Sequence, residues 1–533
     1  MFFDSRRSTV LAKNGMVATS QPLAAMAGLR TLIDGGNAVD AAIATAAVLN
    51  VVEPMSTGVG GDMFALVWNN DEKKVHAING SGRSAAASSL EELTSKGLDR
   101  MPDFGAHSIT VPGAVHGWET LIKAHGTMPL SEVLKPAIQY AEEGYPVSDV
   151  ISFQWSTEQK KLMQVPSGEE MLLNGIPPKQ GEVMRIPTLG RTLRAIAEGG
   201  AVAFYQGEIG PKIAAFVQQQ GGWISAEDMA AHTSDWEEPI STDYRGVTCW
   251  ELPPSDHGLA ALEALNIAEG FDIPSMGAQS ADAYHHLVES MRLAFADAFR
   301  YIADPSKVAV PTKEMLSKEF AAQRRSLIDP TRAMTTVPYG QVQTGGDTVY
   351  ISVVDGKGNA CSFIYSVYSN FGTGMVVPGT GIVMHNRGSL FSLDKDHPNA
   401  LAPNKRPYHT IIPGMTTVNG ELQLCYGVMG AFMQPQGHLQ VISNMVDFDM
   451  DPQQALNALR FMISSDVVSL EEGVPPELVT ELERRGHRTT IISSYYRGIT
   501  GGVGGAQMIQ RDPATGVLRG ASEPRKDGCA VGW

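Results

Sequence analysis

The segment that decides the fold is Thr344–Ser366, TGGDTVYISVVDGKGNACSFIYS. Between residues 348 and 354, apolar side chains alternate with Thr348, Tyr350 and Ser352, the period of a strand with two different faces. The sequence DGKGN that follows supplies a turn, and residues 360–368 are expected to return antiparallel. Thr348 is therefore predicted to begin a strand, on the more polar of its two faces.

The two glycines ahead of this strand predict a flexible lead-in. Residues such as Gly345 and Gly346 can take backbone conformations closed to other residues, which suits a chain that is cut at one peptide bond. Attack of the Thr348 hydroxyl on the Asp347 carbonyl, then hydrolysis, would free Thr348 as a new chain start. Its own α-amine, with an ordinary pKa of about 8, would then serve as the base for its hydroxyl. The alternative is a threonine that only favours strand geometry.

The composition of the 533-residue chain, 43% hydrophobic and 18% charged, is that of a globular protein. Its net charge of −16 disfavours nucleic acid or an anionic membrane as partner, since both attract basic surfaces. The first residues lack the apolar core of a signal peptide, and the apolar run Ala41–Val52 is too short to span a bilayer, so we expect a cytoplasmic protein. The four cysteines are widely separated, so neither a metal site nor a disulfide framework is expected.

Elsewhere the pattern changes from helical to strand-like along the chain. Helical spacing predicts helices over residues 21–33, 38–52 and 281–302. Strands are expected at residues 381–384, 422–426 and 488–493. Residues 130–302 are expected to be mostly helical, and residues 304–346 a loop-like connector. His285 and Glu289 share one helix face, but a third metal ligand is missing, so packed side chains are the better interpretation. The expected helices and strands together predict an α+β fold.

Six segments, taken together and in order, resemble the γ-glutamyltransferase family of N-terminal nucleophile hydrolases. They are GGNAVDAAIATAAVLNVVEPMSTGVGGD (35–62), VPGAVHGW (111–118), GGDTVYISVVDGKGNA (345–360), NFGTGMVVPGTGIVM (370–384), APNKRPYHTIIPGM (402–415) and GVMGAFMQPQGH (427–438). The resemblance implies a precursor that cuts itself before Thr348 into a large subunit, residues 1–347, and a small subunit, residues 348–533. It implies that both build one four-layer αββα sandwich.

The resemblance also assigns roles around Thr348. The family has a second threonine that supports the amine of the nucleophile, and its position falls on Ser366, which keeps the hydroxyl oxygen. The oxyanion hole of the family uses two consecutive glycine amides, and the matching pair is Gly430-Ala431. A backbone N–H survives the change from glycine to alanine, so we expect the hole to persist.

The residues that hold a glutamyl group in this family are altered here. The arginine motif of the large subunit is replaced by NGSGRSAAA (79–87), so that the place of the arginine falls on Ser81, with Arg83 two residues on. An asparagine of the family becomes Tyr368. A serine pair becomes His409-Thr410.

The acidic residue that pairs with the substrate ammonium falls on Leu390, and the neighbouring Arg387 replaces a neutral residue. Losing an acid and gaining an arginine favours substrates that bear a carboxylate without an α-amine, since the guanidinium fork matches a carboxylate. For both Arg387 and Arg83, a structural salt bridge is the alternative to substrate contact.

The resemblance implies an enzyme that forms an acyl-enzyme with a γ-glutamyl-type or related amide, as a glutathione hydrolase or γ-glutamyltransferase does. The altered residues favour an alternative: an amidohydrolase acting on a carboxylate-bearing amide, of the glutaryl- or cephalosporin-acylase or oxamate amidohydrolase type. A second alternative is a non-catalytic binding scaffold. No G-x-S-x-G or P-loop motif supports another class of enzyme. We expect a small-molecule amide substrate and two subunits from one precursor, with a higher oligomer left open. No metal or organic cofactor is expected.

Overall fold

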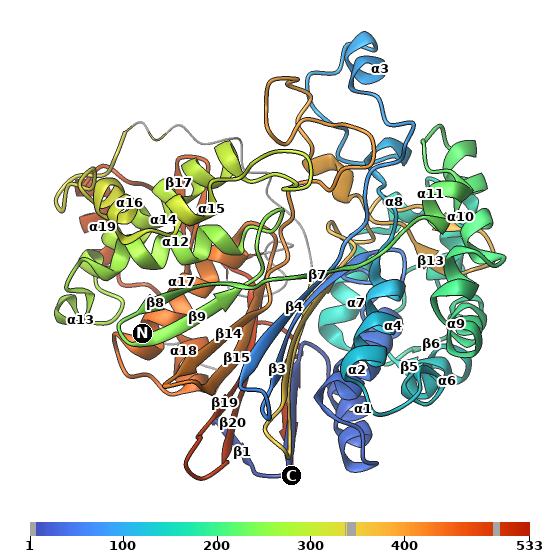
Figure 1. Ribbon diagram of the computed structural model, residues 1–533, viewed down its shortest axis with the longest axis horizontal. Coiled ribbons are helices and arrows are strands. Elements are labelled where there is room, and N and C mark those ends of the chain that lie inside the picture. Colours follow the sequence, from blue (N-terminus) through green and yellow to red (C-terminus); the bar gives the residue numbers. More distant parts are fainter. Residues whose placement is uncertain (1–6, 336, 338–347, 494–501) are drawn as a thin grey trace.

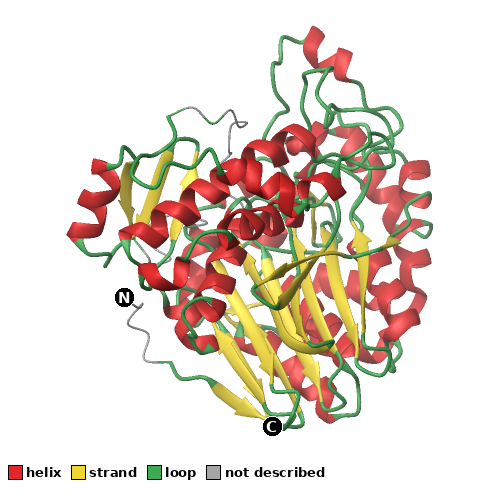
Figure 2. Cartoon of the chain, turned by 60° about the vertical axis from the view of Figure 1, so that its left-hand side comes forward, coloured by secondary structure: helices red, strands yellow, loops and turns green. Residues whose placement is uncertain are grey.

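The computed structural model describes residues 7–335, 337, 348–493 and 502–533. Two seven-stranded antiparallel sheets lie face to face at its centre, and helices cover both outer faces (Figure 1). Figure 2 shows the same arrangement from a second direction. Sheet I runs in the order β21 (Cys529–Gly532), β2 (Gly15–Thr19), β10 (Val349–Asp355), β11 (Ala360–Ser366), β3 (Asp62–Asn69), β4 (Lys74–Gly80) and β7 (Asp235–Glu237). Sheet II runs in the order β1 (Val10–Ala12), β20 (Leu518–Ser522), β19 (Gly505–Arg511), β15 (Glu421–Met429), β14 (Gly414–Val418), β9 (Val247–Glu251) and β8 (Ile240–Tyr244).

Both sheets mix strands from before and after residue 347. In sheet I, β10 lies between β2 and β11, and β11 pairs with β3. In sheet II, β14 pairs with β9, and β1 pairs with β20. The two parts of the chain therefore complete each other's sheets.

Each outer helical layer covers one sheet. On the right of Figure 1, the helices over sheet I include α1 (Pro22–Ile33), α2 (Ala38–Val52), α4 (Ala114–His125), α6 (Lys135–Glu143), α9 (Pro187–Tyr205) and α10 (Ile209–Gln219). On the left, those over sheet II include α12 (Gly258–Glu269), α14 (Ala281–Tyr301), α16 (Lys318–Arg325), α17 (Met433–Val446), α18 (Pro452–Asn457) and α19 (Pro476–Arg484). A small sheet of β16 (Phe461–Ser464), β17 (Val467–Glu471) and β18 (Arg488–Ile492) lies outside α14 and α17.

Strand β10 is buried on both faces because it lies inside these layers. Val349, Ile351 and Val353 join the apolar core between sheet I and its helices. Tyr350 and Val354 join the core between the two sheets. The predicted alternation is confirmed, and the more polar face proves to be the one that meets sheet II.

The structure corrects one expectation about the chain. Residues 304–346 are not a plain connector, because they contain the helices α15 (Thr312–Met315) and α16. Residues 130–302 are mostly helical, as expected, and they also contain β7, β8 and β9 at the edges of the sheets. These strands are only three to five residues long, too short for a clear period. In the described part of the chain, no helix has the length and apolar character needed to cross a membrane.

Candidate active site

Three polar side chains lie side by side at one end of sheet I. Cα pairing of Val349 with Tyr365 brings Thr348 next to Ser366, and Ser366 pairs in turn with Asp62 on β3. The Thr348 hydroxyl donates to Ser366 Oγ at 3.2 Å. Thr348 and Ser366 are both buried.

Two contacts show how β10 of sheet I lies against β15 of sheet II. Ser352 Oγ donates to the Cys425 carbonyl at 2.9 Å, and a Cβ on Gly427 would lie 2.3 Å from the Tyr350 ring. Later residues of β15 therefore face earlier residues of β10. Gly430 and Ala431 follow β15 directly in the chain.

The backbone at the predicted oxyanion pair is unusual. Gly430 has φ 125° and Ala431 has φ 49°, a left-handed conformation that is uncommon for a residue with a Cβ. Among the described residues, no protein group accepts a hydrogen bond from either amide N–H, so both remain available to a ligand. Local strain of this kind is typical of functional sites. Asp347, the other residue of the predicted cut, lies outside the described residues.

Arg387 is a fully buried charged group that Tyr368 and Ser366 connect to Thr348. Its side chain has no solvent exposure, one nitrogen donates to Thr410 Oγ1 at 2.6 Å, and the guanidinium carbon lies 4.6 Å from the Tyr368 ring centroid. Nε and Nη2 have no hydrogen-bond partner in the described part of the chain. Burial lowers the pKa of Arg387 to about 10. Tyr368 also contacts Ser366, because the Tyr368 amide donates to Ser366 Oγ at 2.8 Å.

Two histidines and Arg387 lie around the Asp62 carboxylate, and the sequence alone did not predict that these four side chains meet. Its Oδ2 lies 3.3 Å from His385 Nδ1, 3.2 Å from His409 Nε2 and 3.9 Å from Arg387 Nε. Its Oδ1 accepts from the Gly82 amide at 3.1 Å. The one sequence signal was the glycine turn STGVGGD, which ends at Asp62 and leads into β3.

Other predicted residues face different partners. Ser81 lies beside the Asp62 turn, but its hydroxyl donates to Asn79 Oδ1 at 2.6 Å. Arg83 forms an ion pair with Asp235 at 2.7 Å, on a partly exposed part of the surface. For Arg83, therefore, the salt bridge expected as the alternative is present.

His285 is a packed histidine, as interpreted from the sequence. Its Nδ1 lies 2.8 Å from His487 Nε2, and its Nε2 lies 2.8 Å from the Asp329 carbonyl oxygen. Glu289 pairs with Arg292 at 2.8 Å. In the residues that the structure describes, no group of three or more His, Cys, Asp or Glu side chains could hold a metal ion.

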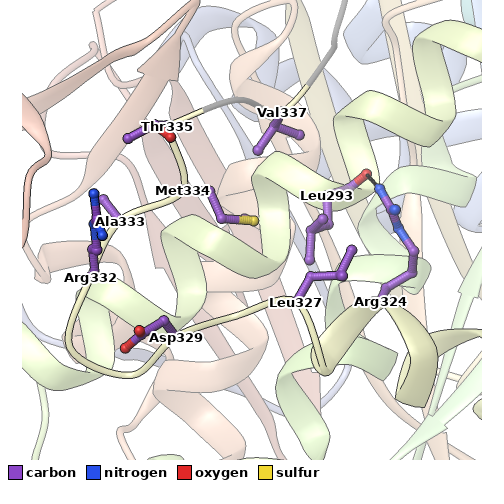
Figure 3. Close-up of a pocket in the computed structure, with 9 residues that line it drawn as sticks. All are labelled: Leu293, Arg324, Leu327, Asp329, Arg332, Ala333, Met334, Thr335 and Val337. Atoms are coloured by element: carbon purple, nitrogen blue, oxygen red, sulfur yellow. Dashed lines mark hydrogen bonds between the residues drawn. The ribbon is translucent and has the colours of Figure 1, made fainter.

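A pocket of about 430 Å³ lies apart from these residues, between α14, α16 and the segment that follows (Figure 3). Apolar Leu293, Leu327 and Met334 line it together with Arg324 and Arg332. It contains none of the predicted site residues, so it does not bear on the candidate active site.

Comparisons with known proteins bear on the family and the fold. The Gamma-glutamyltranspeptidase family model matches residues 24–533. The glutathione hydrolase-like YwrD proenzyme of Bacillus subtilis (strain 168) is 36% identical over 532 residues, covering 98% of this chain and 99% of the relative. The oxamate amidohydrolase proenzyme of Klebsiella pneumoniae is 32% identical over 539 residues, covering 99% and 100%.

The crystal structure of cephalosporin acylase from Bacillus halodurans has a TM-score of 0.94 and 46% identity, covering 100% of this chain and 98% of that one. The fold is therefore the αββα sandwich of the N-terminal nucleophile hydrolases, and the homologues indicate a hydrolase or transferase of that class. The chain belongs to the γ-glutamyltranspeptidase family.

Proposed function

We propose that the chain is a self-processing amidohydrolase, cut between Asp347 and Thr348, that hydrolyses amides of short acids bearing a free carboxylate. The products of the cut would be residues 1–347 and 348–533. The observation that carries the proposal is Arg387, whose buried guanidinium has two nitrogens without hydrogen-bond partners among the described residues. Buried donors are rarely left unsatisfied, so a ligand that accepts from them is the expected partner.

The proposed reaction starts from Thr348, which lies beside Ser366 at one end of sheet I. After the cut, the α-amine of Thr348 takes the proton of its own hydroxyl, and Oγ1 attacks the amide carbonyl. The amides of Gly430 and Ala431 stabilise the oxyanion. The carbon–nitrogen bond then breaks, the departing amine takes the proton, and an ester to Thr348 remains. Water hydrolyses this ester and restores the hydroxyl, whereas an amine in place of water would give acyl transfer.

The surroundings of Arg387 favour an acyl group without an α-ammonium. An ammonium needs an acidic partner, and Leu390 stands where the family has one. Asp62 is already engaged by His385, His409 and an amide. The relatives named oxamate amidohydrolase and cephalosporin acylase support this choice. Because another relative is named glutathione hydrolase-like, a γ-glutamyl amide is the second candidate substrate.

Intact mass tests the cut directly. Purified wild type should give two fragments, one ending at Asp347 and one beginning at Thr348, whereas Thr348→Ala should stay whole. A wild type that stays whole after prolonged incubation would favour the binding-scaffold alternative.

A matched pair of substrates tests the specificity. Glutaryl p-nitroanilide and γ-glutamyl p-nitroanilide differ only in the α-ammonium group. We expect kcat/KM to be at least about tenfold higher for the glutaryl compound, because desolvating an unpaired ammonium costs more than about 1.4 kcal/mol. Equal or faster turnover of the γ-glutamyl compound would refute the assignment and favour the second candidate.

A further inference from the structure

Helix α17 carries three buried glutamines, Gln434, Gln436 and Gln440, and the protein satisfies two of them on both ends of the side-chain amide. Gln436 Oε1 accepts from the Ile463 amide at 2.6 Å, and its Nε2 donates to the Ile463 carbonyl at 3.2 Å. Gln440 pairs with Phe461 in the same way, at 3.0 Å for both bonds. These two side chains therefore hold α17 against β16.

Gln434 has a partner at one end only. Its Oε1 accepts from the Ile412 amide at 2.8 Å. Because a backbone N–H only donates, the atom that faces it must be the oxygen, which leaves the NH₂ group at the other end. Gln434 has no solvent exposure, and its Nε2 has no hydrogen-bond partner among the described residues. Buried donors are rarely left unpaired, so we expect an oxygen from outside the chain to accept from Nε2.

The position of Gln434 relates this donor to the predicted oxyanion pair. Gln434 is the second residue of α17, and its backbone amide donates to the Ala431 carbonyl at 3.0 Å. Cα–Cβ bonds in a helix tilt toward its N-terminus, so a side chain in the first turn leans toward the residues that precede the helix. Gly430 and Ala431 lie there, and their N–H groups also lack acceptors in the described part of the chain. The helix dipole favours a negative charge at this end of α17.

We propose that the side-chain amide of Gln434 is a further catalytic donor, which binds the oxygen of the reacting carbonyl together with the amides of Gly430 and Ala431. This role rests on the proposed function, in which Thr348 Oγ1 attacks that carbonyl. The attack turns the carbonyl oxygen into an anion, so a hydrogen bond from Nε2 is stronger in the transition state than in the bound substrate. The contact of Oε1 with Ile412 holds the amide in place, so the donor does not have to reorganise during the reaction.

Gln434→Glu tests the donor with the least change in shape. It keeps an oxygen facing Ile412 and replaces only the NH₂ group by a second oxygen. We expect kcat/KM to fall about 100-fold or more for glutaryl p-nitroanilide and equally for pentanoyl p-nitroanilide, which has a methyl in place of the carboxylate. For the glutaryl compound, the loss should lie in kcat, with little change in KM.

Gln440→Glu is the matched control, because it makes the same chemical change further along α17. Its folded form should keep kcat close to that of wild type, and urea unfolding shows whether each variant is folded. If Gln434→Glu does not fold, Gln434→Met supplies a neutral side chain of similar length, and its kcat should fall about tenfold or more.

Two kinetic results would overturn the proposal. One is a folded Gln434→Glu with kcat within about threefold of wild type. The other is a loss confined to KM for the glutaryl compound, which would place Nε2 at the substrate carboxylate beside Arg387 instead.

Butylboronic acid tests the same donor without turnover. Its boron accepts the Thr348 hydroxyl oxygen and becomes a tetrahedral anion, so one boron-bound oxygen occupies the place of the oxyanion. By calorimetry, its affinity should fall about tenfold or more in Gln434→Glu, and an unchanged affinity would overturn the proposal. If wild type turns over neither anilide, the proposed function is wrong, and the boronate alone decides the role of Gln434. A wild type that also binds no boronate would overturn both.

Discussion

Replacing Arg387 with methionine is expected to weaken binding of anionic substrates strongly, with only a small change in the stability of the fold. The chain offers a matched control in Arg525, another buried arginine. Arg525 meets Glu471 at 2.6 and 2.7 Å and Glu523 at 2.7 Å, and also donates to two carbonyl groups. Among the described residues, the Arg387 guanidinium makes one hydrogen bond, to Thr410, and its Nε lies 3.9 Å from Asp62 Oδ2. One guanidinium is thus fully satisfied by the protein, and the other is not.

The magnitudes follow from these contacts. Arg387→Met loses a charged hydrogen bond worth about 1.5–3 kcal/mol and a contact with the Tyr368 ring worth about 1 kcal/mol. It also relieves two unsatisfied buried nitrogens, at about 1–3 kcal/mol each. These sums are similar, so the free energy of unfolding should change by less than about 1.5 kcal/mol. Arg525→Met leaves Glu471 buried without its partner and should cost about 3–5 kcal/mol.

Urea unfolding of both variants measures the difference as a shift in midpoint at constant m-value. In parallel, KM for glutaryl p-nitroanilide should rise about 100-fold in Arg387→Met, the loss of about 3 kcal/mol of charge-assisted binding. Equal destabilisation by the two substitutions would show that Arg387 is a structural residue. An unchanged KM would show that the carboxylate binds elsewhere. Either result would refute the reasoning.

Three further substitutions test other parts of the structure. Ser366→Ala removes the acceptor of the Thr348 hydroxyl and should slow self-cleavage and turnover by about 10- to 100-fold, followed by intact mass and anilide assay; wild-type rates would exclude that role. Gly427→Ala places a Cβ 2.3 Å from the Tyr350 ring and should cost about 1–3 kcal/mol by urea unfolding, so an unchanged midpoint would contradict the tight sheet packing. Burial raises the pKa of Glu237 from 4.5 to about 7. Its contribution to the free energy of unfolding is therefore fully present below about pH 4.5 and is lost as the pH rises through about 7. Glu237→Gln should flatten this fall in urea midpoints between about pH 5 and about pH 8, and a slope equal to that of wild type would argue against it.

The hairpin that decides the fold was predictable because its signals are local. The alternation of apolar and polar side chains, the turn and the returning strand all lie within about twenty residues. Strand periodicity and turn residues were therefore enough to predict β10 and β11. The position of Ser366 opposite Thr348 follows from the same hairpin. The pair Gly430-Ala431 could be named only from the family resemblance. Strands β10 and β15 belong to different sheets, and contacts between two sheets leave no local pattern in the sequence.

Asp62 and His385 could not be predicted in the same way. Asp62 closes a glycine turn that resembles many surface turns, and only the pairing of β3 with β11 brings it beside Ser366. His385 finds its carbonyl partner on Thr110, 275 residues away. No local pattern tells which carboxylate will be buried or which histidine will face it. Arg83 is the opposite case. It lies two residues from a position that is functional in the family, but its sequence position did not predict its ion pair with Asp235.

The alternation of strands from before and after residue 347 has a consequence for how the molecule is assembled. In the uncut chain, β2, β10, β11 and β3 are covalently connected, so refolding after denaturation is a unimolecular reaction. The proposed cut would make β10 and β11 belong to one polypeptide and β2 and β3 to another, without changing the folded sheet. Recovery of the cut protein from denaturant would then be second order, slowing on dilution, while that of Thr348→Ala would be independent of concentration. Hydrolysis of one bond would thus change refolding from a reaction of one chain into an association of two chains, so that efficient folding would belong to the uncut precursor.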